Sequence, residues 1–197
     1  MASINNFIAL MRDDGLARDN RFEVVITPPR ILNATNSEFD KLLFYCQSVT
    51  LPGINFLSQA VYTFGESREV IYNRSFDPVE LEFLLDDNME IKWFFDRWAE
   101  NIIDPVTRMA NYYNDYTTTI EISQLDFSEQ EKIKYTVSLH EAFVKTISPI
   151  QYNSSSKEIT KLRATIQYKY WNVTTAPIVI RQGALDIPDT NSTETPI

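Results

Sequence analysis

The stretch "KLRATIQYKYW", residues 161–171, alternates between apolar and polar side chains along its whole length. One side carries Leu162, Ala164, Ile166, Tyr168 and Tyr170, and the other carries Lys161, Arg163, Thr165, Gln167 and Lys169. A period of two is typical of a β-strand with one buried face and one solvated face. We therefore predict a long strand within residues 158–171, with a basic solvated face in a chain whose net charge is −9.

The rest of the chain is also rich in segments of strand character, bounded by prolines and polar turns. We predict further strands at residues 21–29, 41–53, 59–73, 79–85, 118–123 and 132–143. Residues 59–73 are expected to form a hairpin that turns at 65–67, and residues 30–40 are expected to be polar turns. The fold class that follows is mainly β, an antiparallel sandwich or barrel.

One substantial helix is expected at residues 88–103. Asp87 is a suitable N-cap, and Glu90 three residues later completes a capping box. A stripe at helical spacing should be buried, and it comprises Ile91, Phe94, Phe95, Trp98 and Ile102.

Length and composition bound the classes of function. The 197 residues, 44% hydrophobic and 13% aromatic, suffice for one folded domain with appendages. We divide the chain into an N-terminal arm (1–20), a β domain (21–171) and a C-terminal extension (172–197). The 18 basic and 27 acidic residues argue against tight nucleic-acid binding and against attraction to anionic membranes. No segment approaches the ~18 apolar residues of a membrane span.

Few residues are candidates for catalysis or metal binding. The single histidine, His140, is expected at the surface, and the single cysteine, Cys46, in the core or against a partner. With one cysteine no internal disulfide can form, which favours a reducing compartment. Glu80 and Glu82 alternate on a strand as solvated residues, and no metal-ligand spacing or phosphate-binding loop occurs. We therefore expect no enzyme activity, no cofactor and no metal.

Several segments, taken in order, resemble the tail tube proteins of contractile-tailed bacteriophages. They are "ARDNRFEVVI" (17–26), "FYCQSVTLPG" (44–53), "NRSFDPVELEFLLDD" (73–87), the helical "FFDRW" (94–98), "AFVKTISPIQY" (142–152) and "EITKLRATIQYKYW" (158–171). The resemblance covers residues 4–171, and its specificity lies in the order and spacing of the segments. It departs from the simplest members in the extension 172–197 and in the basic residues of the last strand.

The resemblance implies a compact β domain with a helix on its outside. Six copies would join edge to edge into a ring, and rings would stack into a hollow tube inside a contractile sheath. The implied partners are further copies of the chain, the sheath protein, baseplate and terminator proteins, and the tape measure protein and DNA in the lumen. The implied location is the virion, after assembly in the host cytoplasm. Unguarded edges of strands 132–143 and 158–171 are expected to mediate self-association.

Three groups of surface residues follow from this interpretation. The candidates for the wet face of the lumen are Glu80, Glu82, Glu121, Lys132, Lys134, Lys161, Arg163 and Lys169. The candidates for contacts between subunits are the apolar residues Phe7, Ile8 and Leu10 of the arm and Phe64 beside the hairpin turn. The candidates for contact with the sheath lie on the outer face of the helix and are Trp93, Asp96 and Glu100. Trp93 is expected either to be covered by the loop 104–116 or to meet a partner.

Other functions remain open on the sequence alone. A baseplate protein that initiates the tube would share the fold, and so would the hexameric ring protein of a type VI secretion system. A β-sandwich that binds carbohydrate would suit the aromatic residues Tyr112, Tyr113 and Tyr116.

Overall fold

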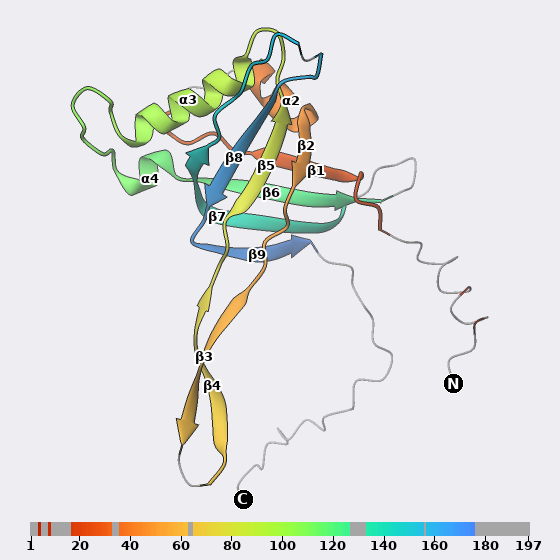
Figure 1. Cartoon of the computed structure of the whole chain (residues 1–197), viewed down its shortest axis with the longest axis vertical. Coiled ribbons are helices and arrows are strands. Elements are labelled where there is room, and N and C mark those ends of the chain that lie inside the picture. Colours follow the sequence, from red (N-terminus) through yellow and green to blue (C-terminus); the bar gives the residue numbers. More distant parts are fainter. Residues whose placement is uncertain are drawn as a thin grey trace, which may run out of the picture.

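The computed structural model shows two antiparallel sheets that share one strand, two helices at one end of the molecule and a long projecting hairpin (Figure 1). It describes residues 17–32, 36–62, 65–126, 133–155 and 157–175, together with Ile4 and Ile8. The prediction of a mainly β, antiparallel fold is confirmed. The strands form a sandwich rather than a closed barrel, since among the described strands β1 and β2 end the path without pairing to each other.

The first sheet, called sheet A here, has the order β1-β6-β7-β9. Its strands are β1 (Phe22–Ile26), β6 (Thr118–Leu125), β7 (Ile133–Ile147) and β9 (Tyr170–Thr175). The second sheet, sheet B, has the order β7-β8-β5-β2. Its other strands are β8 (Lys161–Gln167), β5 (Val79–Leu84) and β2 (Cys46–Val49). Every pair is antiparallel, and β7 belongs to both sheets.

A bend in β7 allows this one strand to serve two sheets. Residues up to Ala142 pair with β6 and residues from Phe143 pair with β8. Between them Glu141 has a φ of 52°, in the left-handed region that non-glycine residues rarely adopt. The register with β6 shifts at the same place, as expected for a bulge that turns a strand.

The predicted strand 158–171 is broken at the same bend. β8 ends at Gln167, and β9 starts at Tyr170 and leaves sheet B to pair with β7 in sheet A. Tyr168 is 3% exposed but Tyr170 is 40% exposed, so the predicted alternation ends between these residues. β9 also continues to Thr175, beyond the predicted start of the C-terminal extension at residue 172.

The core lies between the sheets and α3 (Glu90–Ile102). On β5, Val79, Leu81 and Phe83 alternate with Glu80 and Glu82 and are buried, and Leu85 directly after the strand is also buried. The predicted helical stripe is buried as well, except that Ile102 is only partly buried. The rings of Phe83 and Phe95 lie 5.3 Å apart and those of Phe95 and Trp98 6.2 Å apart. Each such side chain contributes about 1.5–3 kcal/mol on burial.

A second helix, α2 (Asn36–Phe44), occupies residues that were predicted as turns and as the start of a strand. Glu38 and Leu42 are four residues apart and are both buried, so they share one helical face. The prediction was wrong because the apolar run 42–46 is too short for periodicity to distinguish a strand from a helix. Only Cys46–Val49 of the predicted strand 41–53 form a strand.

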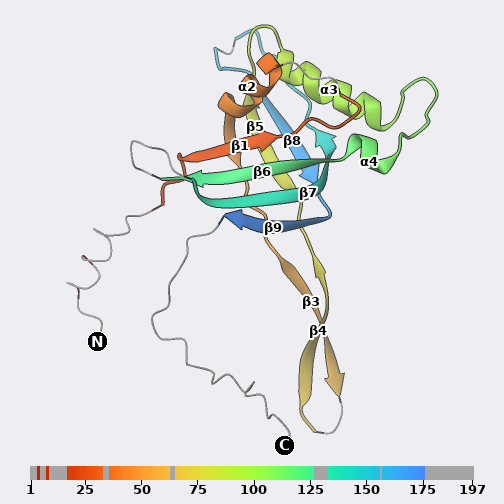
Figure 2. The same ribbon diagram turned by 180° about the vertical axis from the view of Figure 1, so that it is seen from behind.

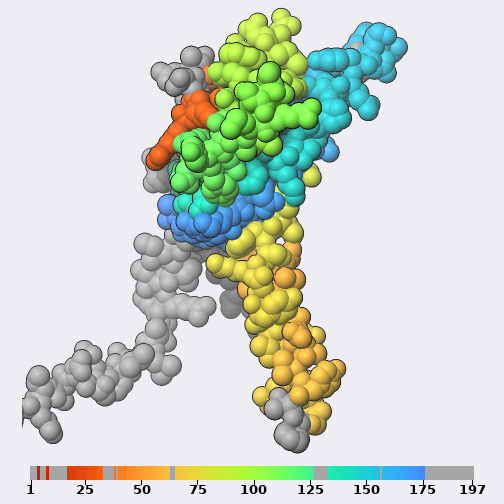
Figure 3. Space-filling view, turned by 90° about the vertical axis from the view of Figure 1, so that its left-hand side faces the viewer, coloured from red at the N-terminus to blue at the C-terminus, as the bar shows by residue number. Residues whose placement is uncertain are grey.

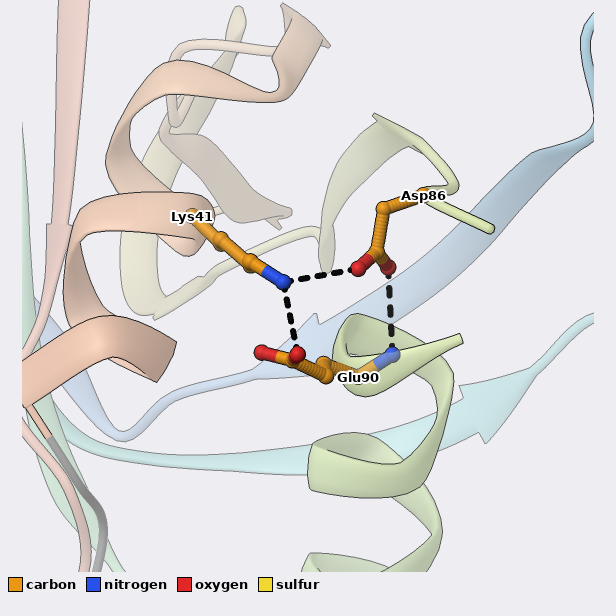
Figure 4. A network of polar contacts seen from close by, with 3 residues as sticks. All are labelled: Lys41, Asp86 and Glu90. Carbon is orange, nitrogen blue, oxygen red and sulfur yellow. Dashed lines mark hydrogen bonds and ion pairs between the residues drawn. The ribbon is translucent and has the colours of Figure 1, made fainter. Parts of the chain in front are cut away.

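The start of α3 depends on Asp86 and not on Asp87. The carboxylate of Asp86 accepts a hydrogen bond from the backbone N–H of Glu90 at 3.1 Å, and the N-cap itself is Met89 with a φ of 57°. Lys41 of α2 bonds Asp86 at 2.8 Å and Glu90 at 2.7 Å (Figure 4). The capping box predicted for Asp87 is therefore absent, and Asp87 is exposed.

The predicted hairpin is confirmed and is longer than expected. It consists of β3 (Asn55–Tyr62) and β4 (Ser67–Ser75), paired with one another only. Gly65 in the turn has a φ of 82°, a conformation that suits glycine. The hairpin projects away from the body of the molecule (Figures 1 and 3). A short helix, α4 (Tyr113–Tyr116), precedes β6, and its Tyr116 carbonyl accepts a bond from Trp98 Nε1 at 2.8 Å.

Candidate functional site: surfaces for assembly

The described residues form no group of three or more His, Cys, Asp and Glu side chains placed to hold a metal ion. His140 lies at the surface, stacked on Tyr170 and bonded to the Asn172 amide oxygen at 2.5 Å. Burial raises the pKa of the Cys46 thiol to about 12, so at neutral pH it is protonated and a poor nucleophile. None of the helices in the described part is long and apolar enough to cross a membrane.

Two basic side chains on the solvated face of β8 form ion pairs with a carboxylate of β5. Glu82 of β5 lies between Lys161 at 3.2 Å and Arg163 at 2.9 Å, because the antiparallel register places Glu82 opposite Arg163. The bond from Arg163, followed by that from Lys161, lowers the pKa of Glu82. Glu80 is exposed on the same strand. This outer face of sheet B is therefore a set of ion pairs and not a basic stripe.

The other candidates for the lumen lie elsewhere. Lys169 binds Glu141 at 2.7 Å where β7 bends, and Lys134 binds Asp126 at 3.3 Å near one end of sheet A. Glu121 lies on β6 in the middle of sheet A. Lys132 lies outside the described residues. The predicted lumen residues are thus divided between the two sheets. Sequence periodicity could not predict this division, because it shows which face of a strand is polar but not which sheet the strand joins.

One face of sheet A carries hydroxyl groups, of which those of Ser123, Thr136 and Ser138 are only 3–5% exposed. Ser123 and Thr136 are cross-strand neighbours joined at 3.0 Å, and Ser138 lies 2.6 Å from the hydroxyl of Thr174 and donates to Glu121 at 3.4 Å. We call these five residues the hydroxyl face. Thr136, Ser138 and Glu121 follow from alternation, and Ser123 at the end of the predicted strand 118–123 shares their face. Thr174 was missed because its strand was predicted to end at residue 171.

Sheet A has two unpaired edges. β1 pairs only with β6, and β9 pairs only with β7, among the described strands. The edges that the sequence suggested, those of 132–143 and 158–171, are covered because β7 and β8 have a neighbour on each side. Unpaired edges present backbone N–H and C=O groups to which another strand can bond. Only the β9 part of the predicted edge remains available.

The hairpin exposes large apolar side chains on both strands. Tyr62 is 79% exposed, Ile71 60% and Tyr72 65%, and Phe56, Leu57, Val61 and Val70 are at least 40% exposed. At its base, Trp171 of β9 donates to the Gly53 carbonyl at 3.3 Å. An isolated two-stranded hairpin is marginally stable in water, so a surface that covers these side chains would stabilise it. The predicted contact residue Phe64 lies outside the described residues.

Of the predicted arm residues, only Ile8 is described, and it is 44% exposed. Phe7 and Leu10 lie outside the described residues. The contact between subunits through the arm therefore stays a prediction.

The outer face of α3 presents a supported tryptophan. Trp93 is 56% exposed, so the loop 104–116 does not cover it. The Arg97 guanidinium lies 3.8 Å from the centre of its ring and binds Glu38 of α2 at 2.5 Å. Asp96 forms an ion pair with Lys92 one turn earlier, and Glu100 is exposed. The cation–π contact fixes one side of the ring and leaves the other available.

The comparison with protein families gives one decisive match. Residues 17–174 match the model of the phage tail tube protein family. The chain belongs to this family. The resemblance read from the sequence is therefore confirmed, and the matched region extends to β9. No protein of curated function matches the chain by sequence.

Solved structures of contractile assemblies share the fold of this tail tube protein. A chain of the anti-feeding prophage baseplate has a TM-score of 0.61 at 14% identity, covering 81% of this chain and 96% of that chain. A chain of the sheath–tube complex of the extracellular contractile injection system PVC has a TM-score of 0.62 at 11% identity, covering 85% and 97%. A chain of the anti-feeding prophage cap has a TM-score of 0.60 at 14% identity, covering 82% and 92%.

Proposed function

We propose that this tail tube protein forms hexameric rings that stack into the hollow tube of a contractile phage tail. The observation that supports ring closure is the pair of free edges on sheet A. β1 and β9 lie on opposite sides of the sheet and run in opposite directions, because three successive antiparallel pairings separate them. β9 of one copy can therefore pair with β1 of the next in the same antiparallel pattern, giving a head-to-tail ring.

The hairpin supports the same junction. It projects past the β9 side of sheet A (Figures 1 and 2), and Trp171 of β9 bonds the chain at its base. A copy that joins at β9 would therefore also receive the exposed side chains of β3 and β4. Phe64 in the turn and the arm residues Phe7, Ile8 and Leu10 belong to the same proposed set of contacts between subunits.

In such a ring the hydroxyl face of sheet A would be turned to the lumen, with Thr174 exposed, Glu121 partly exposed and the hydroxyl groups of Ser123, Thr136 and Ser138 buried in it. Its hydroxyl groups bond to one another, and its charged member, Glu121, is acidic. A neutral to acidic surface does not neutralise phosphates, which supports passage of DNA and a tape measure protein without tight binding. Glu80, Glu82, Lys161 and Arg163 of sheet B would then lie outside the lumen. Glu121 stays a lumen candidate, and so do Lys134 on β7 and Lys169 beside β9; Lys132 is kept as a candidate from the sequence alone.

The remaining surfaces suit the partners of a tail. The tryptophan and acidic groups of α3 would meet the sheath, and the ends of the tube would meet baseplate and terminator proteins. The structures of similar fold come from a baseplate, a sheath–tube complex and a cap. The protein would act as a structural component of the virion, assembled in the host cytoplasm, and not as an enzyme.

Negative-stain microscopy of the purified protein tests the proposal. Long uniform tubes are expected, with rings as their building unit. Rings that never stack would favour a tube initiator or a secretion-type ring protein, and monomers at all concentrations would refute self-assembly.

A deletion of residues 2–12 tests the arm separately. The described β domain begins after this segment, so the variant should stay folded by circular dichroism but fail to form tubes. Tubes of normal length from the deletion variant would remove the arm from the interface.

A further inference from the structure

The loop between α3 and α4 exposes a group of apolar side chains at one end of the molecule. Val106 is 88% exposed, Met109 72% and Tyr112 84%. We call residues 103–112 the tip loop. It extends beyond the sheets at the end where β6 begins (Figures 1 and 2). These side chains do not contribute to the core, so the tip loop is available for a partner.

The tip loop is held in one conformation by its own hydrogen bonds. The Asp104 carboxylate accepts from the backbone N–H groups of Val106 at 2.7 Å and Thr107 at 2.9 Å. These bonds, that of Thr107 first, lower the pKa of Asp104. Ile103 and Ala110 form a bridge across the loop, and Asn111 Nδ2 donates to the Asn101 carbonyl at 2.8 Å. A preorganised loop loses little entropy when it binds.

A cavity of about 180 Å³ lies at the opposite end of sheet A. It is lined by Phe22, Glu23, Leu43, Phe44 and Leu125. We call it the end cavity. Leu125 is the last residue of β6 and Phe22 the first of β1, whereas the tip loop precedes the first residue of β6. The 8 residues of β6 separate the two features by about 25 Å along the strand direction, at ~3.3 Å per residue.

The two features match in chemistry. Four of the five residues that line the end cavity are apolar, and one of them, Phe44, is 77% exposed. The end cavity contains one acidic group, Glu23, and the tip loop carries one basic group, Arg108, which is exposed. No ion pair to another described side chain is formed by Glu23 or by Arg108. In an interface, apolar contacts supply buried area, and a matched pair of opposite charges fixes how the two surfaces align.

We infer that the tip loop of one copy binds in the end cavity of a copy in the adjacent ring. This inference rests on the proposed function. The free edges β1 and β9 run along the sides of sheet A and serve ring closure. The tip loop and the end cavity lie at opposite ends of the strands and are left for stacking, and the cavity takes only the first two residues of β1, Phe22 and Glu23. Because the two features differ, each ring presents the tip loops on one side and the end cavities on the other.

Charge reversal tests the pairing of Arg108 with Glu23. Arg108→Glu, which lies away from both ring-closing strands, should form hexameric rings as wild type does. In both Arg108→Glu and Glu23→Lys the mean tube length should fall at least about tenfold. The double variant Arg108→Glu with Glu23→Lys should regain most of the tube length. Lys157→Glu, a reversal at an exposed site away from both features, should leave tube length unchanged.

The outcomes of this experiment are distinct. Tubes of normal length from both single variants would overturn the inference, and so would double variants as short as the single ones. Loss of the rings themselves in Arg108→Glu would place the contact within a ring and would also overturn it. If wild-type protein forms neither rings nor tubes, the proposed function fails instead.

Cross-linking provides a second test that does not depend on charge. With Cys46→Ser as background, Val106→Cys and Phe44→Cys are combined, assembled tubes are oxidised, and the covalent products are separated in denaturant. A contact between rings links each chain to one above and one below, so the ladder should extend well beyond six chains. A ladder that ends at six would indicate a contact within the ring, and absence of cross-links would indicate no contact; either result refutes the inference. Each single-cysteine control can give dimers at most.

Discussion

Asp86 and Asp87 are adjacent carboxylates with different roles. Asp86 caps α3 through the N–H of Glu90 and binds Lys41, which joins the start of α3 to α2. Partial burial by itself would raise the pKa of Asp86, but the hydrogen bond and charge of Lys41 hold the pKa below its usual value of 3.8. The folded state therefore favours the ionised form.

Asp86→Ala should lower the free energy of unfolding at pH 7 by about 0.5–2 kcal/mol, as is usual for loss of a cap. Because the folded-state pKa is depressed, this contribution is present above pH 3.8 and is lost as the pH falls through the folded value. Urea unfolding of Asp86→Ala and wild type from pH 7 to pH 2 should therefore converge at acidic pH. Asp87→Ala is the control and should stay within about 0.5 kcal/mol of wild type; equal effects would contradict the assignment.

Phe83 and Phe44 provide a second matched pair. Phe83 is fully buried against Phe95, whereas Phe44 is 77% exposed. Phe83→Ala should cost about 3–5 kcal/mol in unfolding free energy, and Phe44→Ala less than about 0.5 kcal/mol. Thermal unfolding followed by circular dichroism measures both. A large loss in Phe44→Ala would show that this residue stabilises the folded domain.

At the scale of elements, local periodicity predicted the strands and helices that bury a single, regularly spaced apolar face. β5 and α3 have regular apolar spacing and a single buried face, so their core residues could be read directly. α2 was missed because its buried face includes Glu38, which binds Arg97 of α3, and a buried carboxylate does not look apolar. The break between β8 and β9 was missed because its cause, the bend at Glu141, lies on the neighbouring strand.

The assembly surfaces were predictable to a lesser degree for a similar reason. Alternation identified Glu82, Lys161 and Arg163 as solvated, and they are, but their mutual pairing depends on the register of β5 with β8. Trp93 is exposed, which is one of the two outcomes expected from the sequence, but its support by Arg97 depends on α2, which was not predicted. Contacts between elements far apart in the sequence leave no signal in a single sequence.

The hairpin is the element whose stability depends most on a partner. Ile71→Asp with Tyr72→Asp changes two exposed residues of β4, so the domain should keep its melting temperature within a few degrees while ring formation is lost. Analytical ultracentrifugation of the variant should show monomers under conditions in which wild type assembles. Gln151→Asp, at an exposed polar position outside the hairpin, is the control for added charge. Rings from the double variant would exclude these two side chains from the interface.

At the scale of the whole molecule, α3 determines what the outside of a tube offers to its sheath. Trp93→Ala with Glu100→Lys should leave tubes intact and prevent sheath assembly on them, as judged by microscopy of tails. Exposed charged contacts contribute only about 0–1 kcal/mol each and weaken with salt, so wild-type sheath attachment should be sensitive to ionic strength. Trp93→Phe with Glu100→Gln keeps an aromatic ring and neutralises the charge at residue 100 instead of reversing it. This variant should retain partial attachment of the sheath. Normal sheathed tails from the first variant would exclude this face.

The number of strands in sheet A has a consequence for direction. Four is an even number, so in an antiparallel sheet the first and last strands point oppositely, and identical copies related by simple rotation continue the alternation without interruption. An odd number would force two parallel neighbours at every junction or an inverted copy. Rotation alone leaves every copy facing the same way along the axis. A filament built from such units has two chemically different ends, so its growth and its termination need not use the same surface.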